Sequence, residues 1–215
     1  RFFDHFLKGE QNGWDKQPKV LLNVRHPGET FVQREENEWP LARTSWTRFY
    51  LEPDGMRLTT TPPTAHRTLS YRPLEEGLTF RTEPLAEPTE ITGPSALQLF
   101  ASSATADADF FVVLRVFDPQ GSELVFQGAL DPHTPIGQGW LRASHRKLDP
   151  KLSLPYRPYH SHDELQPLTP GEVVALDIEI WPTCIVVPAG WRIVLSILGK
   201  DYEWAGAGTA ISNMK

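Results

Sequence analysis

Apolar and polar residues alternate with a period of two in several short segments, and turn residues separate these segments. The clearest examples are 174–180 and 191–197, where every second residue is apolar. Residues 109–118 are apolar on both faces, as is typical of a central strand. The chain also carries 20 prolines and 15 glycines, spread along its length. Short strands joined by such turns predict an all-β fold of the β-sandwich type.

Further strands are predicted by the same alternation at 19–24, 45–51, 77–82, 123–130 and 139–146. Residues 89–103 are expected to form two short strands that are broken at Gly93–Pro94. Residues 52–76 are rich in turn residues, and 149–170 form a loop rich in proline and histidine. The sequence shows neither an internal repeat nor a second domain.

Residues 1–9 are predicted to be the end of a helix that stops at Gly9, a residue suited to a left-handed C-terminal cap. One face of this helix carries only apolar side chains: Phe2, Phe3, Phe6 and Leu7. About two helical turns are not stable alone, so this face requires a partner surface. We therefore expect residues 1–9 to be the tail of an upstream domain and the four apolar residues to make interdomain contacts. Residues 10–215 would form the β domain.

The composition excludes several classes of partner. The chain has 215 residues with 27 acidic and 21 basic side chains, and it contains no basic run that could follow a nucleic-acid backbone. No apolar run approaches the ~18 residues of a membrane span, and no signal peptide is expected. Cys184 is the single cysteine, so an internal disulfide is excluded and a small buried apolar role is favoured. A reducing compartment such as the cytoplasm is the expected location.

The segment GWLRASHR (139–146) raises the question of catalysis because Ser144 precedes His145. On a strand, these two side chains would point to opposite faces, whereas a nucleophile and its base must lie within ~3 Å. No G-x-S-x-G motif occurs, and residues 93–97 lack its second glycine. The chain is therefore predicted to hold no serine triad. We expect His145 and the two arginines of this segment to bridge loops by hydrogen bonds to carbonyls and carboxylates. The predicted structural motif comprises Trp140, Arg142, Ser144, His145 and Arg146.

Two groups of polar residues resemble the beginnings of metal sites. The first group is His160, His162 and Asp163. On a strand, the H-x-H pair of His160 and His162 could begin a zinc site, but no third ligand is identified for it and no H-E-x-x-H motif is found. Asp107 and Asp109 are spaced like calcium ligands without the glycine and distal glutamate of an EF-hand loop. A polar loop and a capping turn are the favoured interpretations, with a structural cation at the aspartates as the alternative. No metal and no cofactor are expected.

The chain contains seven tryptophans. Three lie in apolar strand patterns and are predicted to be core residues: Trp46, Trp181 and Trp191. Three others lie in predicted loops, where they could face a partner domain: Trp14, Trp39 and Trp204.

Several motifs in fixed order resemble the C-terminal region of the family that includes cocaine esterase, α-amino-acid ester hydrolase and X-Pro dipeptidyl-peptidase. The motifs cover almost the whole chain: FFDHFLKG, SWTRFYL, EITGPSALQLFASSATADADFFVVLRVFDPQG, GWLRASHRKLD, LTPGEVVALDIEIWPT and PAGWRIVLSILGKDYEW. The resemblance implies a jelly-roll sandwich of the galactose-binding-like type. It also implies that residues 1–9 belong to the last helix of an upstream α/β-hydrolase domain, which carries the catalytic triad. No catalytic residue of the family maps onto this chain.

The resemblance thus predicts an accessory domain of a serine hydrolase that cleaves small acyl esters or amides. The domain would pack on the catalytic domain, wall its active site and support homo-oligomerisation. Residues 52–74 are shorter than in several relatives, which carry Tyr-Asp-Pro and Gly-Gly there, so no acyl-pocket residue is carried over. Two alternatives come from other classes. One is a free-standing carbohydrate-binding module, and the other is a metal-dependent enzyme built on His160 and His162.

Overall fold

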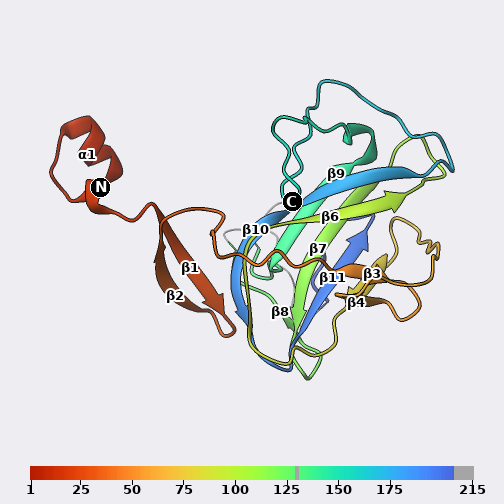
Figure 1. Cartoon of the computed structure of the whole chain (residues 1–215), viewed down its shortest axis with the longest axis horizontal. Coiled ribbons are helices and arrows are strands. Elements are labelled where there is room, and N and C mark those ends of the chain that lie inside the picture. Colours follow the sequence, from red (N-terminus) through yellow and green to blue (C-terminus); the bar gives the residue numbers. More distant parts are fainter. Residues whose placement is uncertain (129–130, 206–215) are drawn as a thin grey trace.

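The computed structural model describes residues 1–128 and 131–205, and two β-sheets packed face to face dominate it (Figure 1). The four-stranded sheet has the order β2-β1-β10-β6. Its strands are β1 (Val20–His26), β2 (Thr30–Glu36), β6 (Thr89–Ala101) and β10 (Val174–Val187). The predicted β-sandwich is thereby confirmed.

The second sheet has seven strands in the order β3-β4-β5-β11-β7-β8, with β9 paired to β7. These strands are β3 (Tyr50–Glu52), β4 (Arg57–Thr59), β5 (Leu78–Arg81), β7 (Asp109–Phe117), β8 (Glu123–Leu124), β9 (Gly137–Arg142) and β11 (Arg192–Leu198). The helical elements are α1 (Phe2–Lys8) and the 3₁₀ turns η1 (Trp14–Lys16) and η2 (Ala143–His145). No helix in the described part of the chain is both long and apolar enough to cross a membrane.

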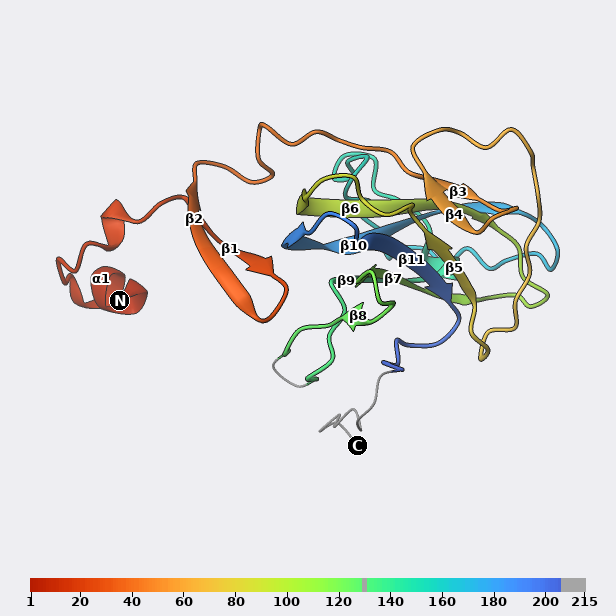
Figure 2. The same ribbon diagram turned by 90° about the horizontal axis from the view of Figure 1, so that it is seen from below.

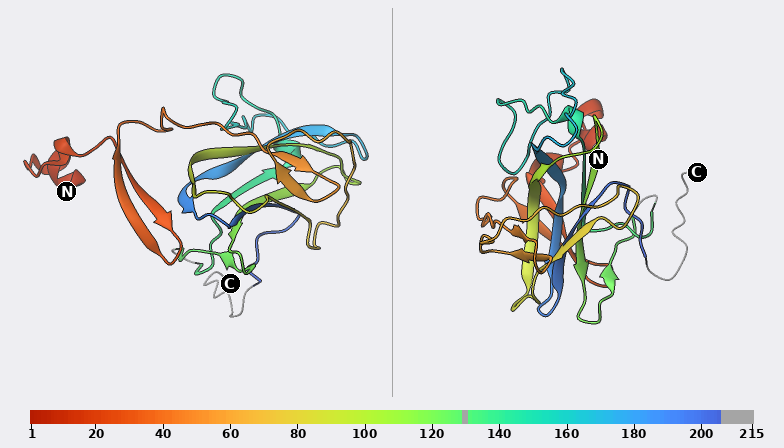
Figure 3. Two further views of the ribbon diagram at one scale, coloured as in Figure 1. Left: turned by 60° about the horizontal axis from the view of Figure 1, so that its bottom comes forward. Right: turned by 90° about the vertical axis from the view of Figure 1, so that its right-hand side faces the viewer.

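The core lies between the two sheets, which are seen edge-on in the right-hand view of Figure 3. Every second residue of β10 faces inward, so Leu176, Ile178 and Ile180 are buried as their alternation predicts. Strand β7 is buried on both faces, with Val112 and Val113 almost fully inaccessible. This is the environment of a central strand, in agreement with its uninterrupted apolar sequence.

Strand β6 is continuous, so the predicted break at Gly93–Pro94 is wrong. Gly93 has φ 140°, a conformation that favours glycine, and the register with β10 shifts between Ile180 and Thr183. Pro94 therefore lies opposite a β-bulge, where its missing N–H removes no regular ladder hydrogen bond. The bulge accommodates the proline without ending the strand.

Other strand predictions need correction. Only Tyr50 and Leu51 of the predicted strand 45–51 lie in a paired strand, β3, and β2 and β4 were not predicted. The predicted strand 139–146 ends at Arg142, after which the chain turns into η2. In the predicted strand 123–130, β8 covers Glu123–Leu124, and residues 129–130 lie outside the described residues.

Two of the three predicted core tryptophans are exposed. Trp46 lies in the irregular segment before β3, so its alternation with neighbours does not point it into the sandwich. Trp181 shares the outward parity of Asp177 and Glu179 and lies at the β10 bulge, which places 62% of its surface in solvent. Trp191 packs against the core as predicted.

Candidate interdomain surface

Helix α1 lies apart from the sandwich, and the β1–β2 hairpin lies between them (Figures 1 and 2). The helix ends at Lys8, and Gly9 adopts the predicted left-handed conformation with φ 70°. None of its residues is buried. The four apolar side chains predicted to make interdomain contacts are all exposed: Phe2, Phe3, Phe6 and Leu7. Contacts of the Phe2 ring with Phe6 and Trp14 gather the aromatic side chains into one cluster.

The β1–β2 hairpin projects from the sandwich and exposes further apolar side chains. Its only ladder contact with the rest of the described sheet is the parallel pair Arg25 and Ile185. Leu21, Phe31 and Val32 each expose about half of their surface. Clusters of exposed apolar side chains are typical of surfaces that contact another domain or another protein.

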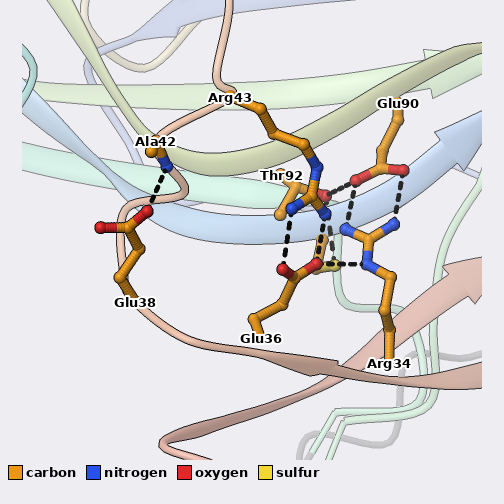
Figure 4. Close-up of polar contacts among 8 residues, drawn as sticks. Arg34, Glu36, Glu38, Ala42, Arg43, Glu90 and Thr92 are labelled. Carbon is orange, nitrogen blue, oxygen red and sulfur yellow. Dashed lines mark hydrogen bonds and ion pairs between the residues drawn. The ribbon is translucent and has the colours of Figure 1, made fainter.

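A cluster of ion pairs ties the hairpin to the sandwich (Figure 4). The Arg34 guanidinium on β2 donates two hydrogen bonds to the Glu90 carboxylate on β6, with distances of 2.8 and 2.6 Å. Arg34 Nε also lies 2.7 Å from Glu36 Oε1. Arg43 donates to both oxygens of Glu36, so the segment that follows β2 joins the same cluster. Bidentate pairs of this kind fix orientation as well as position.

The cluster also shifts the acidity of its members. Hydrogen bonds from Arg34 lower the pKa of Glu90 to about 2, and the Thr92 hydroxyl adds a bond of 2.7 Å. Arg43 lowers the pKa of Glu36, and Glu90 raises that of Arg34. The carboxylates therefore stay ionised at neutral pH. The sequence analysis missed this cluster, although Arg34 and Glu36, two positions apart on a strand, had to share one face.

Ser144 is bound to Asp107 and makes no hydrogen bond with His145. Its hydroxyl donates to Asp107 Oδ2 at 2.6 Å, and its amide donates to Oδ1 at 2.9 Å. Partial burial acts to raise the pKa of Asp107, but hydrogen bonds from Ser144 and from the Ala108 amide outweigh it, so the net pKa is lowered. Ser144 and His145 lie in the 3₁₀ turn η2, and their side chains diverge there. The prediction had placed both residues on a regular strand, so that geometry is corrected.

The arginines of the same motif hold neighbouring segments. Arg142 donates from Nε and Nη2 to the two oxygens of Asp109, both at 2.8 Å. Arg146 donates to the carbonyl oxygens of Ala143 and Gln166. Both carboxylate oxygens of Asp109 therefore accept hydrogen bonds from a guanidinium. Trp140 is exposed, and its ring contacts Trp181 edge to face at 5.1 Å.

The two histidines of the candidate metal site, His160 and His162, do not share one face of a strand. His162 has φ 52°, so His160 and His162 do not lie on a regular strand, in agreement with the predicted loop, and His162 Nδ1 lies 3.0 Å from His145 Nδ1. His160 Nε2 lies 3.0 Å from the carbonyl oxygen of Asp177. Asp163 accepts hydrogen bonds from Ser161 and Lys147. Within residues 1–128 and 131–205, no three His, Cys, Asp or Glu side chains are grouped to hold a metal ion.

Comparisons with known proteins agree on one family. The model of the X-Pro dipeptidyl-peptidase C-terminal non-catalytic domain matches residues 12–212. A Mycobacterium bovis protein assigned by its name to the serine esterases is 27% identical over 94% of this chain. The cocaine esterase of a Rhodococcus species is 25% identical over the same share. The chain spans 35% and 37% of the lengths of these two relatives, respectively.

Solved structures show the same relationship. The crystal structure of a CocE/NonD family hydrolase from Staphylococcus aureus superposes with a TM-score of 0.87 and 26% identity. It is matched over 95% of this chain and 38% of its own length. An α-amino acid ester hydrolase shares the fold with a TM-score of 0.67 at 20% identity. The chain therefore belongs to the family of X-Pro dipeptidyl-peptidase C-terminal non-catalytic domains, in the form found in CocE/NonD-type hydrolases.

Proposed function

We propose that the chain is the accessory C-terminal domain of a serine hydrolase that cleaves acyl esters or amides. It packs on an upstream α/β-hydrolase domain and forms part of the wall of the active site. The observation that carries this proposal is the exposed apolar face of α1, together with the exposed Leu21 and Val32 of the β1–β2 hairpin. Relatives nearly three times as long supply a domain that could cover these residues.

The chemistry of the chain supports a non-catalytic role. Asp107 engages both the hydroxyl and the amide of Ser144, and only 5% of Ser144 is accessible. A nucleophile needs an accessible hydroxyl and an adjacent base. In the proposed enzyme, the reaction therefore takes place on residues upstream of this chain, and this domain excludes water and shapes the substrate pocket.

Self-association is part of the proposal. The Trp140–Trp181 pair is exposed at the junction of β9 and β10, where a second copy could cover it. Light scattering after size exclusion would test this part. A dimer that Trp181→Ser converts to a monomer would support it, and a monomer before substitution would contradict it.

A second candidate function is carbohydrate binding. The rings of Trp46 and Tyr156 stack with centroids 4.3 Å apart, and 53% of Trp46 is exposed. Exposed aromatic faces can stack on sugar rings. Saturable binding to a glycan array, abolished by Trp46→Ala, would favour this candidate over a purely interdomain role.

Fluorophosphonate labelling tests the main proposal. We expect no adduct on the 24.3 kDa chain and one adduct per molecule on the longer polypeptide that contains it. Peptide mapping should place that adduct outside residues 1–215. A stoichiometric adduct on Ser144 would refute the proposed division of labour, and a longer polypeptide without any adduct would refute the serine hydrolase.

A further inference from the structure

A surface cavity of about 390 Å³ opens beside the β1–β2 hairpin. Its lining comes from the hairpin, the segments next to β2 and β9, and the β10 bulge: Asn23, Arg25, Phe31, Trp39, Ile136, Pro182, Thr183 and Cys184. The volume lies within the ~300–1,000 Å³ typical of small-molecule sites. Aromatic and aliphatic walls with a few polar groups are also typical of such sites.

Arg25 is the only charged residue in this lining. Its guanidinium lies 4.8 Å from the centroid of the Phe126 ring, and this stacking orients the group. Within the described residues, no carboxylate lies within 4.0 Å of it, in contrast to Arg34 and Arg43 of the neighbouring ion cluster. The N–H donors of Arg25 are therefore available to a ligand.

The segments that carry the aromatic walls are held in place by hydrogen bonds. Trp39 lies in the segment that Arg43 ties to Glu36, and the Ala42 amide donates to Glu38 Oε1 at 3.1 Å (Figure 4). The hairpin tip is fixed as well, because the Gln127 amide donates to Glu29 Oε1 at 2.9 Å. The cavity is thus bounded by anchored segments, which reduces the entropy that a ligand must offset on binding.

We propose that this cavity binds a small organic carboxylate with a flat apolar body. The planar fork of Arg25 matches the geometry of a carboxylate, and the Asn23 amide supplies a further donor. Phe31 and Trp39, each partly exposed, flank the apolar body. A single cation in the lining suits one carboxylate better than a multiply charged phosphate.

The ligand class connects this cavity to the proposed reaction. Hydrolysis of an acyl ester or amide releases a carboxylic acid, so the cavity would hold a molecule of the product class. This connection rests on the proposed function, whereas carboxylate binding itself does not.

The test uses the longest natural polypeptide that contains this chain, treated with a fluorophosphonate to block any reactive serine. Binding of 4-fluorophenylacetate is followed by fluorine NMR, with 4-fluorophenylacetamide as the neutral probe. We expect the acid to bind at least about 10-fold more tightly than the amide, because a charge-assisted hydrogen bond is stronger than one between neutral groups. Arg25→Met should weaken acid binding by a similar factor, and Asn23→Ala by about 3-fold.

Arg48→Met is the matched control, because Arg48 is exposed, lies outside the cavity and has no carboxylate partner among the described residues. It should bind the acid like the unsubstituted protein. Equal affinity of Arg25→Met and the unsubstituted protein would overturn the proposal, as would equal binding of acid and amide. If Arg25→Met fails to fold, unchanged affinity of the Asn23→Ala variant would overturn it instead. If the longer polypeptide forms no fluorophosphonate adduct but still binds the acid, this result would contradict only the proposed function.

Discussion

Ser144 and Asp107 lie 37 positions apart in the chain and are joined by two hydrogen bonds, one from the hydroxyl and one from the amide of the serine. Asp107 also accepts a bond from the Ala108 amide at 2.9 Å, immediately before β7. One carboxylate thus links the turn after β9 to the start of the central strand. This arrangement supports the proposal that the Ser-His pair has a structural role, although it resembles a catalytic motif.

Ser144→Ala should lower the free energy of unfolding by about 2 kcal/mol, because it removes a hydrogen bond to a charged, partly buried carboxylate. Urea denaturation measures this loss. Ser102→Ala, at an exposed serine, should leave the free energy within about 0.5 kcal/mol of its original value. Fluorophosphonate labelling of the longer polypeptide should not change, and its loss in the Ser144→Ala variant would contradict the structural role.

The ion cluster predicts a defined dependence of stability on pH. The pKa of Glu90 is about 2 in the folded chain, below its ordinary value of 4.5, so the ionised form stabilises the fold. This contribution is present above pH 4.5 and is lost as the pH falls toward 2. Because 36% of the Glu90 side chain is exposed to solvent, screening limits its contribution to about 1 kcal/mol.

Glu90→Gln should therefore destabilise the chain near pH 7 and have little effect near pH 2. Unfolding curves measured across this range check the prediction. Glu87→Gln, at a nearby exposed glutamate with no ion pair among the described residues, should be neutral throughout. A constant difference between Glu90→Gln and the unsubstituted protein at every pH would contradict the electrostatic origin.

Gly139→Ala should destabilise the sandwich by about 3 kcal/mol or more. A Cβ atom at this position would lie 1.9 Å from the Glu179 carbonyl oxygen, so the backbones of β9 and β10 would have to separate. Gly55→Ala is a matched control, since the added atom would meet only the flexible side chains of Arg57 and Glu52. Thermal unfolding compares the two, and equal midpoints would show that the two strands separate easily.

Replacing both Phe3 and Phe6 by serine tests whether α1 packs against another domain or lies on the protein surface. In the isolated chain both side chains are exposed, so stability should change by less than about 0.5 kcal/mol. In the longer polypeptide, the loss of two buried aromatic contacts should cost at least about 2 kcal/mol. Glu10→Ser, at an exposed polar position, should have no effect in either protein.

The sequence predicts β7, β11 and the first half of β10 well, because burial fixes the pattern of their apolar residues. Leu176, Ile178 and Ile180 had to face one side, and β7 had to be central. Prediction failed where the backbone departs from a regular strand. The residues before Tyr50 alternate without pairing, and η2 interrupts the predicted strand at Ala143. A period-two pattern does not reveal such turns, because they depend on long-range partners such as Asp107.

The ion cluster and the cavity were harder to predict for a related reason. Arg34 and Glu90 lie 56 positions apart, and only the fold brings them within hydrogen-bond distance. The lining of the cavity comes from segments as distant as Asn23 and Cys184. By contrast, the apolar face of α1 is local, so its four residues were identified from helical spacing alone.

The long pairing of β6 with β10 affects how the protein is made. Seventy-two residues separate Ala101 from Val174, the ends of these two strands that pair with each other. At the ~5–20 residues per second of protein synthesis, β6 waits about 4–15 s on the ribosome before its partner is translated. During that interval its apolar face has no sheet to join. The unpaired strand is therefore open to aggregation for longer than the strands of a fold built from local hairpins would be.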